Sequence, residues 1–134
     1  DARKVSTLIS DLSISIESSS STSGRTATEH AEVCTLPWDS VSGTTPTIAN
    51  AGAYSLTMSG NTTFTFPSPA ANYSTGFILQ LTGNGSTVTY PNSVDFAGGT
   101  APDAPGNGET DILVFWTRDG GTTWYGALAI DAAG

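Results

Sequence analysis

The sequence predicts an all-β domain, specifically an antiparallel β-sandwich built from hairpins. Three stretches carry this prediction, because in each of them apolar residues alternate with polar ones on both sides of a turn signal. They cover residues 52–67, 75–91 and 111–126. We divide the chain into an N-terminal arm with a Ser-rich linker, residues 1–24, and the sandwich domain, residues 25–134.

The hairpin expected over residues 111–126 organises the rest of the domain. A three-residue loop from Asp119 to Gly121 sets Trp116 opposite Trp124, and this register gathers one apolar set for the core. That set is Ile112, Val114, Trp116, Trp124 and Leu128. The other face then carries Leu113, Phe115 and Tyr125 and is apolar too. Either the hairpin is a central strand pair, or another subunit covers this face, and we assign these three residues to the subunit interface.

The loop of this hairpin has the spacing of the Asp-box, a turn motif found in sialidases and other proteins. The matching positions are Thr117, Asp119, Gly121, Thr123 and Trp124. The Asp carboxylate can accept hydrogen bonds from N–H groups within the turn, and Gly suits a left-handed position there. The motif is a folding device without chemistry of its own, so we expect these residues to define the fold.

The two earlier hairpins follow the same reasoning. In residues 52–67, a loop from Ser59 to Asn61 places five side chains on one face, namely Tyr54, Leu56, Met58, Phe64 and Phe66. In residues 75–91, Asn84-Gly85 predicts a type I′ turn that pairs Leu81 with Val88. The shared face there carries Phe77, Leu79, Leu81, Val88 and Tyr90.

The N-terminal arm fits two conformations. Val5, Leu8, Leu12 and Ile16 fall at helical spacing, which favours a short helix over residues 2–12, whereas Leu12, Ile14 and Ile16 fall at strand spacing. The following Ser-rich stretch, residues 18–24, is typical of a flexible linker. The four residues at helical spacing either cover the chain's own core or attach to a partner, and the sequence leaves both open.

The charge and composition of the chain exclude some classes of binding partner. The chain has 134 residues, a net charge of -8 and only four basic residues, which are scattered. Binding to phosphate needs clustered Lys and Arg, so we expect neither nucleic acid nor an anionic membrane as a partner. No apolar run is long enough for a membrane-spanning helix. With no initiator Met and no secretory signal, we expect a processed or trimmed chain, or part of a longer protein.

The sequence contains no recognisable catalytic or cofactor motif. His30 is the only His and Cys34 the only Cys, which is too few for a zinc site or a convincing nucleophile–base pair. Four acidic residues in or beside the 91–110 connection match no calcium-loop spacing: Asp95, Asp103, Glu109 and Asp111. We therefore expect no enzyme activity, no metal and no cofactor.

The body resembles a β-domain near the C-termini of tailed-phage virion proteins, especially tail-fibre-like and surface-decoration proteins of marine and cyanobacterial phages. The resemblance covers residues 34–128 and rests on motifs in the same order, at residues 60–66, 76–81, 88–96, 98–102, 111–115 and 117–126. That family often has Trp where Tyr90 and Phe96 stand here. It implies a homotrimer and carries no catalytic residues to transfer.

These observations lead to one main hypothesis and one alternative. The main one is a virion surface structural protein, a homotrimeric knob whose arm attaches to capsid or tail proteins, as a capsid decoration, head fibre or tail-fibre piece. The alternative is a carbohydrate-binding module or receptor-binding tip for a host-surface glycan. For that function, Tyr73, Trp38 and Tyr125 are the candidate aromatic platform.

Overall fold

The computed structural model describes residues 35–49 and 52–134, and its compact β-rich unit spans Leu36–Gly134. Several sequence predictions concern residues outside this description. They are the boundary between residues 24 and 25, the arm with Val5, Leu8, Leu12 and Ile16, and the two residues His30 and Cys34. The all-β class is confirmed for the described part, which contains strands and one short 3₁₀ helix, η1 (Ala97–Gly99).

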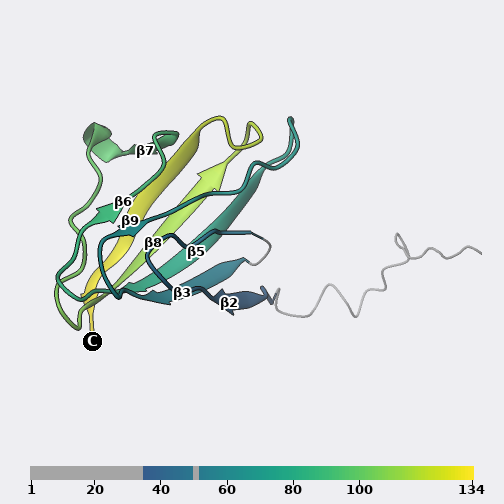
Figure 1. Cartoon of the computed structure of the whole chain (residues 1–134). Coiled ribbons are helices and arrows are strands. Elements are labelled where there is room, and N and C mark those ends of the chain that lie inside the picture. Colours follow the sequence, from purple (N-terminus) through teal and green to yellow (C-terminus); the bar gives the residue numbers. More distant parts are fainter. Residues whose placement is uncertain (1–34, 50–51) are drawn as a thin grey trace, which may run out of the picture. The chain divides into compact units, whose positions relative to one another are not determined.

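Six strands form one mixed sheet in the spatial order β2-β3-β5-β8-β9-β7 (Figure 1). Their bounds are β2 (Trp38–Ser40), β3 (Ala53–Thr57), β5 (Thr75–Thr82), β7 (Val94–Phe96), β8 (Thr110–Thr117) and β9 (Trp124–Ala133). A second sheet contains β4 (Thr62–Thr63) and β6 (Val88–Thr89), which pair in parallel. Only β5–β8 and β8–β9 pair antiparallel, whereas β2–β3, β3–β5 and β7–β9 are parallel.

Two of the three predicted hairpins are wrong in their pairing. β3 is followed by β4 and β5 by β6, but in both cases the chain crosses from the main sheet to the small one instead of folding back beside itself. The result is two stacked arches, with β3 on β5 and β4 on β6 in parallel. A third segment extends the stack, because Thr47 bridges Thr65 and the Ile48 N–H donates to the Thr65 carbonyl at 2.9 Å.

The alternation of side chains is the same in an arch and in a hairpin, which explains this error. Both turn the chain so that alternate residues point inward, and they differ only in which backbone groups pair. The inward faces were therefore predicted correctly. Tyr54, Leu56, Met58 and Phe64 are buried from the first arch and Phe77, Leu79 and Leu81 from the second, with Phe66, Val88 and Tyr90 partly buried against them.

The third hairpin, β8–β9, exists, but its register and its faces differ from the prediction. Trp116 pairs with Tyr125, and Val114 with Ala127. The loop holds residues 118–123, because β8 ends at Thr117 and β9 starts at Trp124. This wider loop turns Trp124 to the opposite face from Trp116, and a slip of one residue exchanges the two faces of a strand.

The core lies between the main sheet and the arched layer and is rich in aromatic rings. Phe66 lies at the centre of this cluster, with ring centroids 5.0 Å from Phe77, 4.9 Å from Phe115 and 5.3 Å from Trp124. Edge-to-face packing at these distances adds to the free energy gained from burial. From the other edge, β7 contributes Val94 and Phe96, which are partly buried against the same core.

Candidate interaction surface

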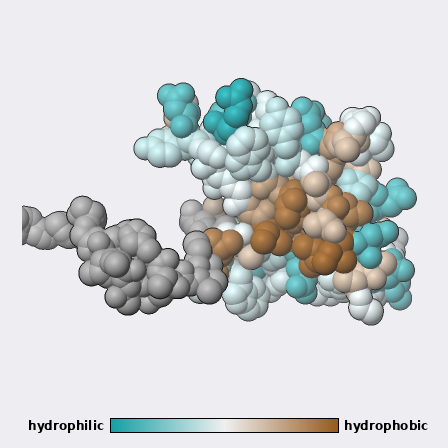
Figure 2. Space-filling view, turned by 180° about the vertical axis from the view of Figure 1, so that it is seen from behind, coloured by the Kyte–Doolittle hydropathy of each residue, from teal (hydrophilic) through white to brown (hydrophobic). Residues whose placement is uncertain are grey.

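The face of the main sheet turned away from this core is apolar and exposed. Its large side chains come from β2, β5, β8 and β9, and we call them the apolar sheet face: Trp38, Ile78, Ile112, Val114, Trp116, Tyr125 and Ile130. Trp38 is 68% exposed, Ile130 50% and Trp116 47%. The view from behind the sheet shows apolar residues gathered in a single patch (Figure 2). Exposed apolar patches of this kind mark interaction sites on soluble proteins.

The strand register aligns these side chains in rows across the sheet. The longest row pairs Trp38 with Ala53, Ala53 with Ile78, Ile78 with Val114, and Val114 with Ala127. A neighbouring row pairs Gln80 with Ile112 and Ile112 with Ile130. Paired residues have their Cβ atoms close together on one side of the sheet, so the longest row forms a continuous apolar ridge, and Ile112 and Ile130 extend the apolar surface beside it.

One end of the apolar sheet face carries a stacked aromatic pair. The rings of Trp116 and Tyr125 lie 6.1 Å apart with an angle of 28° between their planes. The Trp116 indole N–H donates to Ser74 Oγ at 2.8 Å, which holds the indole in this orientation. The pair therefore presents a flat aromatic surface to solvent.

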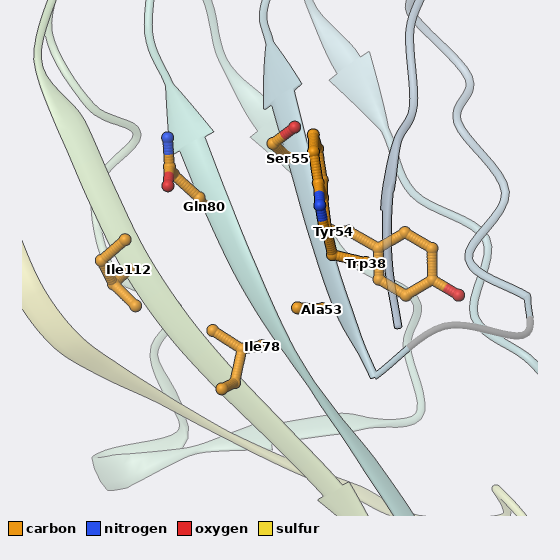
Figure 3. A pocket seen from close by; sticks show the side chains of 7 residues that line it. All are labelled: Trp38, Ala53, Tyr54, Ser55, Ile78, Gln80 and Ile112. Carbon is orange, nitrogen blue, oxygen red and sulfur yellow. The ribbon is translucent and has the colours of Figure 1, made fainter. Parts of the chain in front are cut away.

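The other end is hollowed into a shallow groove of about 410 Å³ beside Trp38 (Figure 3). Its lining combines Trp38, Ala53, Ile78 and Ile112 with the polar side chains of Ser55 and Gln80. Tyr54 also borders it, but its side chain is buried on the core side, where its hydroxyl accepts the Ala49 N–H at 3.0 Å. With one amide and one hydroxyl among apolar groups, the groove offers contacts to a partner and no titratable group for chemistry.

The two rows through Val114 and Ile112 contain no charged side chain. The row of Trp116 and Tyr125 ends at one carboxylate, Asp95 in β7, which pairs with Tyr125 at the rim. Copies of this chain repel each other because each carries a net charge of -8. This repulsion is weakest between faces that carry few charged side chains. The face therefore suits an apolar protein surface, including that of an identical chain.

The Asp-box residues form a closed set of hydrogen bonds in the β8–β9 loop. The Thr117 hydroxyl lies 2.7 Å from the Thr123 carbonyl and 2.9 Å from Asp119 Oδ1, and it accepts the Gly121 N–H at 3.1 Å. Asp119 Oδ1 accepts the Thr123 N–H at 2.9 Å. Gly120 and Gly121 both adopt positive φ, +71° and +85°. The predicted folding role of this turn is consistent with that geometry.

Hydrogen bonding stabilises the ionised form of Asp119. The Thr123 backbone N–H, followed by the side-chain hydroxyl of Thr117, lowers the pKa of this carboxyl below its usual range. The turn therefore loses stability as the pH falls through the lowered pKa, because protonation removes an acceptor for these donors.

Thr117→Val tests the turn directly. Thr117 is completely buried, so Val keeps its shape but leaves the Gly121 N–H and the Thr123 carbonyl without this partner. We expect a loss of about 1–3 kcal/mol in the free energy of unfolding. Urea unfolding measures this loss, and Thr122→Val is the control, because Thr122 is an exposed residue of the same loop. Equal stability of Thr117→Val and wild type would contradict the role of the hydroxyl.

Ionisation of the Tyr90 phenol should lower the stability of the folded chain at alkaline pH. Burial, followed by the negative charge of Asp111, raises the pKa of the Tyr90 phenol well above its usual value of 10.0. The unfolded chain then ionises this phenol at a lower pH than the folded chain. Stability is therefore constant up to the ordinary pKa and falls above it, by up to about 1.4 kcal/mol per pH unit. Urea unfolding between about pH 9 and about pH 11 measures how steeply the free energy of unfolding falls with pH. Tyr90→Phe should remove the contribution of this phenol. An unchanged slope in Tyr90→Phe would contradict the role of Tyr90.

The residues predicted for the subunit interface separate into two groups. Leu113 and Phe115 are 1% and 2% exposed, so their assignment to a subunit contact is wrong. They lie in this chain's own core, because the six-residue loop exchanges the faces of β8. Tyr125 is 49% exposed on the apolar sheet face and stays a prediction for the interface.

Most of the apolar sheet face was missed from the sequence. Ile112, Val114 and Trp116 were expected in the core but lie on this face. Leu128 pairs with the buried Leu113 on the core side, as expected, but is 36% exposed. A signal was present in β5, where Ile78 lies between Gly76 and Gln80 on the side opposite Phe77 and Leu79. An Ile at that position already indicated that the outer face of the sheet is apolar.

The predicted sugar platform is not a single surface. Trp38 in β2 and Tyr125 in β9 are four strand steps apart, a distance of roughly 19 Å. Tyr73 is 67% exposed and lies in the connection before β5. Tyr125 instead stacks on Trp116.

The four acidic residues considered for calcium do not meet. Asp111 is buried and accepts the Ala132 N–H at 2.9 Å, whereas Glu109 closes its own turn by accepting the Gly106 N–H at 3.2 Å. Within residues 35–49 and 52–134, no three His, Cys, Asp or Glu side chains are grouped so that they could hold a metal ion. In the same residues, no helix is long and apolar enough to cross a membrane.

Comparisons with protein-family models, with curated proteins and with solved structures found no match for this chain.

Proposed function

We propose that this chain is a non-enzymatic structural protein on the surface of a tailed-phage particle. It forms a homotrimeric knob with a β-sandwich body, and its N-terminal arm attaches the knob to capsid or tail proteins. The ordered motifs at residues 60–66, 76–81 and 117–126, which resemble phage virion domains, support the particle location. The observation that carries the self-association is the apolar sheet face, which lies opposite a core that is already complete.

The size of this face supports a protein partner. A fully buried aromatic side chain contributes 150–250 Å², so the exposed fractions of Trp38, Trp116 and Tyr125 together offer roughly 250–400 Å². The aliphatic rows between them add to this area. A stable interface of standard size buries about 800 Å² on each partner, and such interfaces are enriched in Trp and Tyr at their centre.

The location is tested in the particle. Cryo-electron microscopy of the source virion should place three copies of this body together on the outside, at the capsid or on the tail. A variant lacking residues 1–24 should keep its trimeric body and fail to join the particle, whereas full-length Thr89→Glu, which changes an exposed residue of β6, should join it normally. Absence of the wild-type chain from purified particles would overturn the proposal.

The stacked pair of Trp116 and Tyr125 favours glycan binding as the second candidate function. A flat aromatic surface with a fixed indole is suited to stacking on a sugar ring. Under this function, Tyr125→Ala abolishes binding on a glycan array without unfolding the chain, and Trp38→Ala, at the far edge of the sheet, leaves it unchanged. An array without hits for the wild-type chain would exclude the glycans tested.

A further inference from the structure

The chain contains two Asn-Gly pairs in exposed loops. Asn84-Gly85 lies at the tip of the arch between β5 and β6, and Asn107-Gly108 lies in the connection before β8. Both glycines adopt a positive φ, +84° at Gly85 and +85° at Gly108. The two pairs are thus matched in sequence, exposure and backbone conformation.

An Asn-Gly pair can modify itself without an enzyme. The backbone nitrogen of Gly attacks the side-chain carbon Cγ of Asn, the Cγ–Nδ2 bond breaks, and ammonia leaves. Water then opens the resulting five-membered imide at either carbonyl, which yields aspartate or isoaspartate. The step needs a backbone nitrogen that is free to react, and Gly is the best following residue because no Cβ hinders the approach.

The surroundings of Asn84 satisfy these needs. The Ser86 N–H donates to Asn84 Oδ1 at 3.1 Å, which closes a small ring containing the Gly85 peptide and keeps the side-chain carbonyl beside it. In the part of the chain that the structure describes, the Gly85 nitrogen donates no hydrogen bond. The attacking atom and the carbon under attack are therefore both available.

The surroundings of Asn107 do not leave the following Gly nitrogen free to attack. The Gly108 N–H donates to the Gly83 carbonyl at 3.0 Å, and this bond must break before the nitrogen can attack. The nitrogens that follow Asn61 and Asn72 are held in the same way, because Thr62 N–H donates to Thr87 O at 2.9 Å and Tyr73 N–H to Ala70 O at 3.1 Å. Those two also carry side chains that hinder ring closure.

We propose that Asn84 is a site of spontaneous deamidation and isoaspartate formation in the folded protein, and that Asn107 is protected by the bond from Gly108 to Gly83. The reaction adds one negative charge to a chain that already carries -8. Isoaspartate also inserts an extra carbon into the main chain and turns Asn84 Oδ1, the acceptor of the Ser86 N–H, into a main-chain carbonyl oxygen. The Thr87 N–H, which donates to Asn61 Oδ1 at 3.1 Å, lies directly after this turn, so the modification loosens the contact between the two arches.

Ageing of the full-length chain tests this proposal. After incubation at neutral and mildly alkaline pH, peptide mass spectrometry and isoaspartate methyltransferase labelling should place most of the modification at Asn84. Its rate should rise about tenfold per pH unit, because the deprotonated Gly85 amide is the reactive species. Asn84→Ser should lose the signal, and Asn107→Ser should retain it.

Denaturant provides the matched control. In the unfolded chain both Asn-Gly pairs lose their surroundings, so Asn107 should be modified as fast as Asn84. Modification of Asn107 at the rate of Asn84 in the folded chain would overturn the proposal. So would a folded Asn84 that stays intact under conditions where the unfolded chain reacts.

Discussion

Replacing Trp124 by Ala should remove about 3–5 kcal/mol from the free energy of unfolding, the largest stability effect that we expect for a single core residue. Trp124 is 1% exposed, and its ring lies 5.3 Å from Phe66 and 5.5 Å from Phe77, centroid to centroid. The substitution leaves a cavity at the junction of the two layers. A loss of this size is a large part of the total stability of a small domain, about 5–15 kcal/mol.

Trp116→Ala is the matched control, because the two tryptophans lie on adjacent strands but on opposite faces of the sheet. In chains dilute enough to be monomeric, Trp116→Ala should cost less than about 1 kcal/mol, since its ring is 47% exposed. Urea unfolding of both variants measures the difference. Equal losses would contradict the face assignment and would restore the register with Trp116 opposite Trp124.

Val114→Glu should dissociate the assembly while the body stays folded. Val114 lies in the longest row of the apolar sheet face, between Ile78 and Ala127, and it is 38% exposed in the single chain. In the assembly the new carboxylate would be buried without a partner, which costs several kcal/mol per subunit. In the monomer it remains in water, so circular dichroism should be unchanged.

Size-exclusion chromatography with light scattering measures this effect as a loss of mass from three chains to one. Thr89→Glu introduces the same charge on an exposed strand position of β6, away from the main sheet, and should leave the assembly intact. Val114→Glu that keeps the wild-type mass and melting temperature would exclude the apolar sheet face as the subunit contact.

The sequence predicted the inward faces of the chain well, because alternation depends only on strand geometry. Phe77, Leu79 and Leu81 are buried as expected, and the Thr117–Thr123 turn forms the hydrogen bonds that its residue types indicate. Strand pairing was beyond the same information. The Asn84-Gly85 signal predicts a reversal of the chain, and the chain does reverse there, but β5 and β6 pair with different neighbours.

Whether the candidate surface could be predicted depended on a shift of one residue in the β8–β9 register. The side-chain bonds of Thr117 and Asp119 support a loop of six residues, and alternation alone could not distinguish it from a loop of three. That difference exchanged Phe115 and Trp116 between core and surface. The general expectation of a β8–β9 pair that is apolar on both faces was correct, because it follows from the residues of both strands in either register.

The most direct test of self-association through the apolar sheet face is the mass of the full-length chain in solution at micromolar concentration. We expect a single species of three chains that becomes monomeric in Val114→Glu. A monodisperse wild-type monomer would contradict it, and the apolar sheet face would then need a partner other than a second copy of this chain.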